Sequence, residues 1–355
     1  MTRRVVTVVV LCGSLVLAVL GCSGAPPATQ APAKAPVARS ATATPTRWTF
    51  TVDGVRPVTA NGSQDTQAQA AGVVCASDQL AALCGVPIIC HEKGFRRVGP
   101  VERIMSRWVD RAICMTDDIA AHYRARGVRA HQFLTIPDGI DPTRFTTGGG
   151  ERVRDELGIA HDAPVVGIVG HIQEWKGQAI VVEAVARARR RIPDIRCLVV
   201  GGVHRAGADY AARLRELIAH EGLEQNVLLI GARRDVAACM SAMDVVLHAS
   251  VTPEPFGRVL IEAMATGRPL IAPSEGGPRQ IVVDGETGLL VPPRDPTALA
   301  DAIVALLSAP ARRIAMGAAA RARVETIFDI RHQVRAVETV ITDVLDGRRT
   351  MVEAA

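Results

Sequence analysis

At 355 residues the chain is long enough for two domains of ordinary size, and a hydrophobic content of 48% with 3% aromatic residues is typical of a globular α/β protein. The formal net charge of +5 permits contact with phosphorylated substrates or an anionic membrane surface. It does not indicate a nucleic-acid partner, because basic and aromatic residues are not interleaved along the chain. The eight cysteines form no Cys-x2-Cys motif and no Cys/His cluster, which argues against a zinc site and favours buried reduced thiols.

The first 22 residues resemble a bacterial lipoprotein signal. Arg3 and Arg4 form a basic start, residues 5–20 are apolar but short for a membrane span, and Cys22 follows as the candidate lipid-carrying residue. An uncleaved anchor or a wrongly chosen start codon are the alternatives. Residues 23–66 comprise an Ala/Pro/Thr-rich tether and a segment that we cannot place. The localisation stays open, since the signal indicates a membrane anchor and reduced thiols indicate the cytoplasmic face.

Residues 67–148 show short apolar strands that alternate with helices, a pattern that predicts the parallel βαβ units of a first domain. The expected strands are 72–76, 86–90, 111–115 and 133–136, and the expected helices are 79–83, 101–109 and 117–126. Only the second half of a Rossmann-like domain is recognisable, so we expect an incomplete sheet with an exposed strand edge.

Residues 149–346 predict a complete second domain with a final helix over 330–345, followed by a tail at 347–355. The strands are apolar on both faces, as a sheet covered by helices requires. They are expected at 165–169, 197–200, 227–230, 245–247, 270–272 and 289–291. Helices are expected near 178–191, 209–219, 236–243, 257–265, 296–307 and 311–328.

The most informative segment is Pro253–Ala265, which places Glu254 just before a predicted helix and Glu262 two turns inside it. Proline at 253 and 255 disfavours helix before the motif, and a helical apolar period begins at Phe256. The N-terminus of a helix attracts anions, and a neighbouring carboxylate accepts hydroxyl hydrogens. A phosphate and hydroxyls held side by side are typical of a nucleotide sugar.

By itself a Glu-x7-Glu pair arises about once by chance in a chain of this length and is equally compatible with a solvated helix start. The context is more specific. An apolar strand precedes the motif, a second strand follows at 269–272, and a glycine loop follows at 274–278. This order is how an open parallel sheet forms a ligand crevice at its strand carboxyl ends.

These motifs resemble the donor domain of retaining glycosyltransferases of the GT-B fold, in particular family 4, from about residue 163 to about 345. The segments that carry the resemblance are 170–177, 199–202, 229–232, the Glu254/Glu262 pair, Gly276-Gly277 and, in the first domain, 137–145. The resemblance implies an α/β, GT-B-like protein with two Rossmann-like parallel-sheet domains, the N-terminal one incomplete. It also implies that the final helix crosses back onto the first domain.

The implied activity is transfer of a sugar, a hexose, from a UDP- or GDP-sugar to a hydroxyl of a lipid, glycan or small-molecule acceptor, in glycolipid, cell-envelope or polysaccharide synthesis. In this family the leaving diphosphate is thought to help deprotonate the acceptor, and neither a metal nor a further cofactor is required. Lys176 would meet the donor phosphates, Glu254 the transferred sugar and Glu262 the ribose hydroxyls. His91 would touch the donor sugar, so we regard Glu254, His91 and Lys176 as the catalytic candidates.

The remaining donor-binding candidates are backbone and phosphate contacts. Phe256, Gly257 and Arg258 would offer backbone N–H groups, and Gly231 with Arg233 would lie near the base or the phosphates. His171 stands where the family usually has arginine. Arg233 is equally compatible with a solvated arginine. The first-domain basic residues favour a solvated face, with a contact for an anionic acceptor or membrane as the alternative: Lys93, Arg96, Arg97, Arg103 and Arg107.

Two other functions stay open from the sequence. A lipid-tethered nucleotide-sugar-binding protein without activity agrees with the lipoprotein-like start and the incomplete first domain. A sugar-nucleotide epimerase of the same fold would convert the donor without an acceptor. A glycosidase that uses Glu254 and Glu262 as its two carboxylates is disfavoured, because Lys176 and the glycine loop would then have no role.

Overall fold

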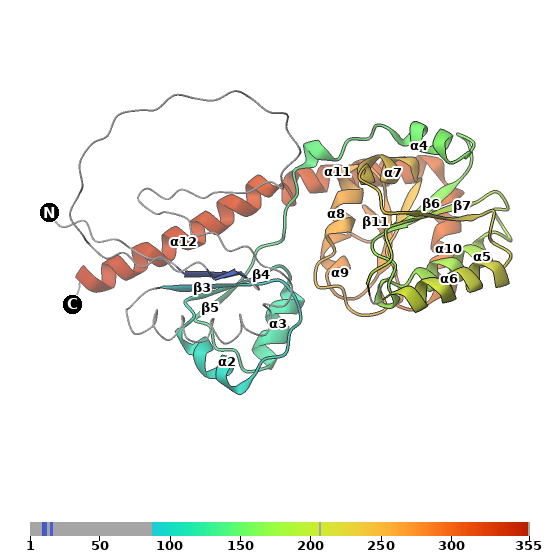
Figure 1. Ribbon diagram of the computed structural model, residues 1–355. Coiled ribbons are helices and arrows are strands. Elements are labelled where there is room, and N and C mark those ends of the chain that lie inside the picture. The colour runs from blue at the N-terminus through green and yellow to red at the C-terminus, as the bar shows by residue number, and fades with distance from the viewer. Residues whose placement is uncertain (1–8, 13–14, 17–86, 206, 354–355) are drawn as a thin grey trace, which may run out of the picture.

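The structure is a computed structural model that describes residues 9–12, 15–16, 87–205 and 207–353, with side chains described from 87 to 347 apart from residue 206. The expected tether at 23–66 and the elements expected at 72–76 and 79–83 lie outside these residues. Two α/β domains, each with its own sheet, are joined by the segment before α4 and by the C-terminal helix (Figure 1). The predicted α/β class with two parallel sheets is confirmed.

The first domain contains a sheet in the order β2-β1-β3-β4-β5, in which β1, β3, β4 and β5 run parallel. Its elements are β1 (Val9–Cys12), β2 (Leu15–Val16), β3 (Ile88–Glu92), α2 (Pro100–Met105), the 3-10 helix η2 (Ser106–Trp108), β4 (Arg111–Cys114), α3 (Asp117–Ala125) and β5 (Gln132–Thr135). The sequence predicted an exposed edge for this sheet without assigning it to a strand, and in the structure β3 is paired with β1 because residues 9–12 add a parallel strand there. Whether residues 1–22 act as a signal stays a prediction.

The second domain contains a six-stranded parallel sheet in the order β11-β10-β9-β6-β7-β8. This order reverses at β6, which is the arrangement that creates a ligand crevice at the strand carboxyl ends. The strands are β6 (Val165–Val169), β7 (Arg196–Val200), β8 (Val227–Gly231), β9 (Val245–Leu247), β10 (Leu270–Pro273) and β11 (Gly288–Val291).

Helices cover both faces of this sheet, as its two-sided apolar strands predict. Side chains of alternate strand positions enter two separate buried clusters, one against α7, α8 and α11 and the other against α5, α6 and α10. The helices are α5 (Gln178–Ala188), α6 (Ala208–His220), α7 (Val236–Ala242), α8 (Arg258–Ala265), α9 (Pro278–Ile281), α10 (Pro296–Leu307) and α11 (Pro310–Ile327). Four short helical segments were not expected as elements: α9, η3 (Pro142–Arg144), α4 (Gly150–Glu156) and η4 (Glu174–Lys176).

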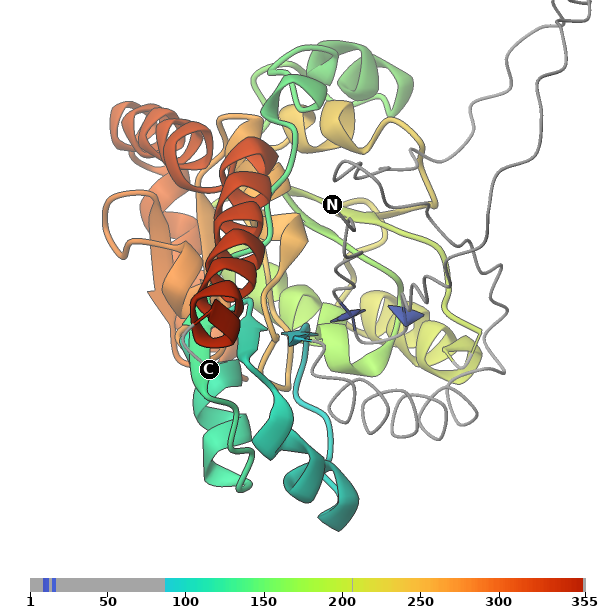
Figure 2. The same ribbon diagram turned by 90° about the vertical axis from the view of Figure 1, so that its left-hand side faces the viewer.

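The last helix, α12 (Ile330–Glu353), leaves the second domain and lies across the sheet of the first (Figures 1 and 2). Its Val340 and Val344 pack against the first-domain residues Ile89, Ile113 and Ile136, so the predicted crossover is confirmed. The tail predicted at 347–355 is wrong as far as residue 353, because the helix continues to Glu353.

The segment that links the domains is held against the start of α12. Gly139 N–H donates to Gln333 Oε1 at 3.0 Å, and Gln333 Nε2 donates to Asp138 Oδ1 at 2.8 Å. A Cβ on Gly139 would lie 2.6 Å from the Cα of Ile330, so this crossing requires glycine. Both connections between the domains therefore meet at one place.

Within the described part of the chain, no single helix has the length and apolar character needed to cross a membrane. The consecutive helices α10 and α11 meet the length and composition criteria only as a pair, and they are bent by 101° relative to one another.

Candidate active site

The Glu254 carboxylate lies in a buried polar cluster at the carboxyl end of β9. Lys176 Nζ donates to Glu254 Oε2 at 2.7 Å, and His248 Nε2 and Ser250 Oγ lie 3.2 and 3.3 Å from the same oxygen. The side chains of Lys176 and Glu254 are only 17% and 11% exposed, so solvent screens their ion pair weakly. Two residues that the sequence places 78 positions apart are thus in direct contact.

The charges around Glu254 keep it ionised. Burial opposes ionisation of this carboxyl group, but the hydrogen bond with His248 and the positive charge of Lys176 outweigh burial and lower its pKa to about 2. Because an ionised carboxylate only accepts hydrogen bonds, the network assigns the hydrogen between the two residues to His248 Nε2. Glu254 is therefore a fixed negative charge that can accept hydrogens from sugar hydroxyls.

Glycine permits the close packing of the loop that carries Glu254. The glycine loop lies directly against it: Gly277 N–H donates to the Glu254 carbonyl oxygen at 2.7 Å. A Cβ on Gly276 would lie 2.6 Å from that oxygen, and a Cβ on Gly277 would lie 2.2 Å from the carbonyl oxygen of Phe256. Gly257, with φ of 98°, begins α8 in the left-handed region that favours glycine.

Lys176 is fixed at the end of η4 by the turn that follows it. Gly177 has φ of 71°, and a Cβ there would lie 1.9 Å from the carbonyl oxygen of Ala249, so the turn packs on the chain just after β9. The Lys176 ammonium also lies 3.8 Å from the centre of the Trp175 ring. An ammonium carries three hydrogens, so Lys176 retains donors for a phosphate beyond the one that it gives to Glu254.

Glu262 lies in α8 one turn after Arg258, and their side chains approach to 3.7 Å. Burial raises the pKa of Glu262, and the positive charge of Arg258 opposes this shift. The side chain of Glu262 is 21% exposed and that of Arg258 is 64% exposed. Glu262 is thus a half-buried acceptor near the start of the helix, as ribose hydroxyls would require, whereas the Arg258 side chain extends into solvent.

Phe256 and Arg233 are both held by packing or ion pairs. Phe256 is 3% exposed, and its ring lies edge-on to that of Phe328. Arg233 follows Gly231 at the end of β8 and is paired with Glu156 and, at 2.9 Å, with Asp235, which raises its pKa. A contact of Arg233 with a donor base or phosphate stays a prediction, and it would compete with these carboxylates.

His171 and His91 are not joined to the Glu254 cluster by any interaction among the described residues. The His171 ring lies edge-on to that of His204, with 6.0 Å between ring centres. His91 lies inside β3 rather than at its end, and burial together with Lys93 lowers its pKa against the opposing effect of Asp138 and Glu92. Its Nε2 is buried and has no hydrogen-bond partner among the described residues. The roles of both histidines stay predictions.

The first domain contacts the second beside Glu254. Thr116 Oγ1 donates to the carbonyl oxygen of Pro255 at 3.2 Å, and Asp117 N–H donates to Gln280 Oε1 at 3.2 Å. Arg279 and Asp118 form an ion pair at 3.0 Å. The loops after β4 and around Glu254 therefore face one another across the domain boundary, as a site enclosed by two domains requires.

Sequence reasoning missed His248 and Ser250. Both come directly after the apolar strand β9, at the carboxyl end of the sheet, where ligands bind in open α/β folds. His248 is 4% exposed and Ser250 is 1% exposed. Polar residues at positions 248 and 250 after three apolar ones were the signal that could have found them.

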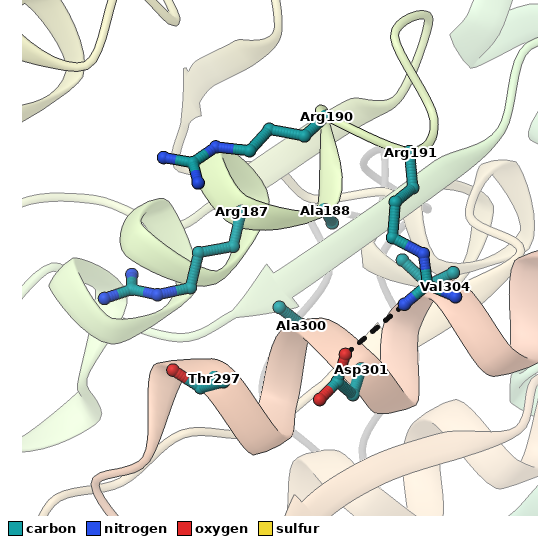
Figure 3. A pocket seen from close by; sticks show the side chains of 8 residues that line it. All are labelled: Arg187, Ala188, Arg190, Arg191, Thr297, Ala300, Asp301 and Val304. Carbon is teal, nitrogen blue, oxygen red and sulfur yellow. Dashed lines mark hydrogen bonds and ion pairs between the residues drawn. The ribbon is translucent and has the colours of Figure 1, made fainter.

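A cavity of about 270 Å³ lies between α5 and α10 (Figure 3). Its arginines are Arg187, Arg190 and Arg191, and Arg191 is paired with Asp301 at 3.4 Å across it. None of the predicted site residues lines this cavity. The described residues also contain no group of three or more His, Cys, Asp or Glu that could hold a metal ion.

The model of the family "Glycosyl transferases group 1" matches residues 150–323, which covers the six-stranded sheet and the Glu254 cluster. The second domain belongs to the group 1 glycosyl transferases. The sequence-based resemblance to family 4 and the GT-B fold is thereby confirmed.

Relatives of known structure and sequence agree with this assignment. HepE from Anabaena in complex with UDP-glucose superposes with a TM-score of 0.69 at 27% identity, over 77% of this chain and 76% of that one. The D-inositol 3-phosphate glycosyltransferase of Corynebacterium urealyticum is 38% identical over 192 residues, 52% of this chain and 45% of the relative. The relative of the same name in Geodermatophilus obscurus is 35% identical over 63% of this chain and 49% of its own length. The chain thus spans about half the length of these curated relatives.

Proposed function

We propose that this protein is a retaining glycosyltransferase that transfers a hexose from a nucleoside diphosphate sugar to an acceptor hydroxyl. The observation that carries the proposal is the direct contact of Lys176 with Glu254 beside the N-terminus of α8. A cation for the diphosphate and a fixed carboxylate for the sugar then lie together where the helix attracts anions. UDP-glucose bound to HepE supports a UDP-sugar as the donor.

The proposed division of labour follows from the chemistry of each group. Lys176 and the N–H groups at the start of α8 stabilise the charge that develops on the leaving diphosphate. Glu262 accepts the ribose hydroxyls, and Glu254 orients the transferred sugar. The acceptor belongs to the class of lipid, glycan or small-molecule hydroxyls, and glycolipid or cell-envelope synthesis at a membrane is the setting that we propose.

Titration calorimetry with UDP and GDP, followed by transfer from a labelled UDP-sugar, tests the proposal. We expect UDP to bind, and we expect Glu262→Ala to weaken this binding while Glu216→Ala, an exposed acid on α6, leaves it unchanged. Failure of the wild-type protein to bind either nucleotide would refute the proposal. Binding without sugar release or transfer would indicate the nucleotide-sugar-binding alternative, and donor conversion without an acceptor would indicate the epimerase.

A further inference from the structure

Large apolar side chains are exposed together on one short helical segment of the first domain. Val101, Ile104 and Trp108 are 53%, 54% and 44% exposed. They account for three of the six large hydrophobic residues that are exposed in the described part of the chain, and the other three are far apart in sequence. Positions 101, 104 and 108 follow the spacing i, i+3, i+7, so they lie on one side of α2 and η2.

Exposed basic side chains lie on the same segment as this apolar row and just before it in the sequence. Arg97, Arg103 and Arg107 are exposed, and within the described residues their guanidinium groups make no hydrogen bond or ion pair. The acid on this helix, Glu102, is already engaged by Arg96 and by the N–H of Gly99 at 2.7 Å. We call the six residues Val101, Ile104, Trp108, Arg97, Arg103 and Arg107 the α2 face. It therefore combines apolar groups with unbalanced positive charge.

The opposite side of the same segment anchors it in the domain. Met105, Ser106 and Val109 are buried, and Ser106 Oγ accepts the N–H of Arg129 at 2.8 Å. The buried side thus holds the helix in the domain. Packing within the domain does not explain why the exposed side carries large apolar residues. In both views α2 lies at the outer end of the first domain, on the side away from α12 (Figures 1 and 2).

We propose that the α2 face is a docking surface for an anionic lipid bilayer. Tryptophan prefers the boundary between water and hydrocarbon, and exposed arginines beside it attract anionic headgroups. Three apolar residues are too few for a stable protein interface, which usually takes about 20 residues a side, but they suit reversible contact with a membrane surface. The surface is separate from the Glu254 cluster and does not depend on the proposed reaction.

Co-sedimentation of the full chain with lipid vesicles tests the charged part of the surface. The readout is the ratio of binding to phosphatidylcholine–phosphatidylglycerol vesicles over binding to phosphatidylcholine alone, because residues 1–86 are the same in every variant and any contribution from them cancels in the comparison. Each basic residue near an anionic surface contributes roughly a fivefold factor, so Arg103→Glu with Arg107→Glu lowers this ratio about 30-fold or more. Arg190→Glu with Arg312→Glu, which reverses two exposed charges on the second domain, is the matched control and leaves the ratio unchanged.

Quenching of tryptophan fluorescence by brominated lipids tests the apolar part. We expect quenching in anionic vesicles, and we expect Trp108→Phe to remove most of it while UDP binding by the second domain is unchanged. A ratio that is equal in the wild type and the arginine variant would overturn the proposal, as would quenching that Trp108→Phe does not alter. A concentration-dependent dimer that the Arg103 and Arg107 changes dissociate would also overturn it, because the occupant would then be a second copy of the chain.

Discussion

The pH dependence of stability offers a direct test of the Glu254 cluster. The perturbation is Glu254→Gln, which keeps the size of the side chain and removes its charge. Burial by itself would raise the pKa of Glu254, but the hydrogen bond with His248 and the charge of Lys176 outweigh it. The pKa in the folded protein is therefore lowered from an ordinary 4.5 to about 2. A group whose pKa is depressed by folding stabilises the protein above its unfolded pKa, and this contribution is lost as the pH falls toward the folded pKa.

The magnitude follows from the size of this shift. A lowering of about 2.5 pKa units corresponds to roughly 3 kcal/mol of stabilisation at neutral pH, of which about 2 kcal/mol is lost by pH 3. The Glu254 side chain is 11% exposed, so solvent screening reduces the stabilisation from its charge only slightly. The difference in unfolding free energy between the wild type and Glu254→Gln should therefore shrink by about 2 kcal/mol between pH 7 and pH 3.

Urea unfolding of both proteins at a series of pH values measures this difference. Comparison with the variant removes the contribution of all other carboxyl groups, because both proteins share them. Glu325→Gln is the control, since Glu325 is an exposed acid whose ion pair among the described residues is with Arg321 of its own helix. If the wild type and Glu254→Gln keep the same stability difference at all pH values, the interpretation of the buried charge cluster is wrong.

Further predictions concern the same cluster. Glu262→Ala should weaken UDP binding, and Glu254→Ala should lower turnover more than affinity; negligible effects in both would reject the assigned roles. Burial raises the pKa of Glu262, and only its carboxylate form would accept the ribose hydroxyls as proposed. As the pH is lowered, UDP affinity should therefore begin to fall at a pH above the ordinary carboxyl range, which calorimetry at several pH values would detect. His248→Ala should reduce kcat more than it changes KM, and His248→Gln, which keeps an N–H donor, should restore part of the loss; equal kcat in both variants would contradict a role in orienting Glu254.

The sequence was sufficient to place the strands of the second domain, for a physical reason. Its strands are apolar on both faces, so their positions could be assigned from the chain alone, and the turn before Glu254 was marked by proline and glycine. From the sequence we expected Lys176 and Glu254 to belong to the same site, but we did not predict that they contact one another. Their 2.7 Å ion pair depends on how η4 and the end of β9 pack, which local patterns do not encode.

Part of what the sequence did not indicate depends on distant parts of the chain. The short polar helix α4 was not expected, and with it Glu156, the partner that engages Arg233. This helix packs against α7, and such tertiary packing overrides local sequence preference. The helix α12 was expected to end near residue 345, but it reaches Glu353.

The turn at Gly177 allows a last test of how Lys176 is positioned. Gly177 and Gly285 have similar positive φ angles, 71° and 77°, but a Cβ on Gly177 would lie 1.9 Å from the Ala249 carbonyl oxygen, whereas nothing lies within 4 Å of one on Gly285. Both alanine variants therefore pay the left-handed cost of about 1–2 kcal/mol, and only Gly177→Ala must also displace the chain beside Lys176. We expect thermal unfolding to show a larger loss for Gly177→Ala and calorimetry to show weaker UDP binding in that variant alone. Because the two substitutions share their backbone strain, equal UDP affinity in both would mean that the turn does not position the Lys176 ammonium.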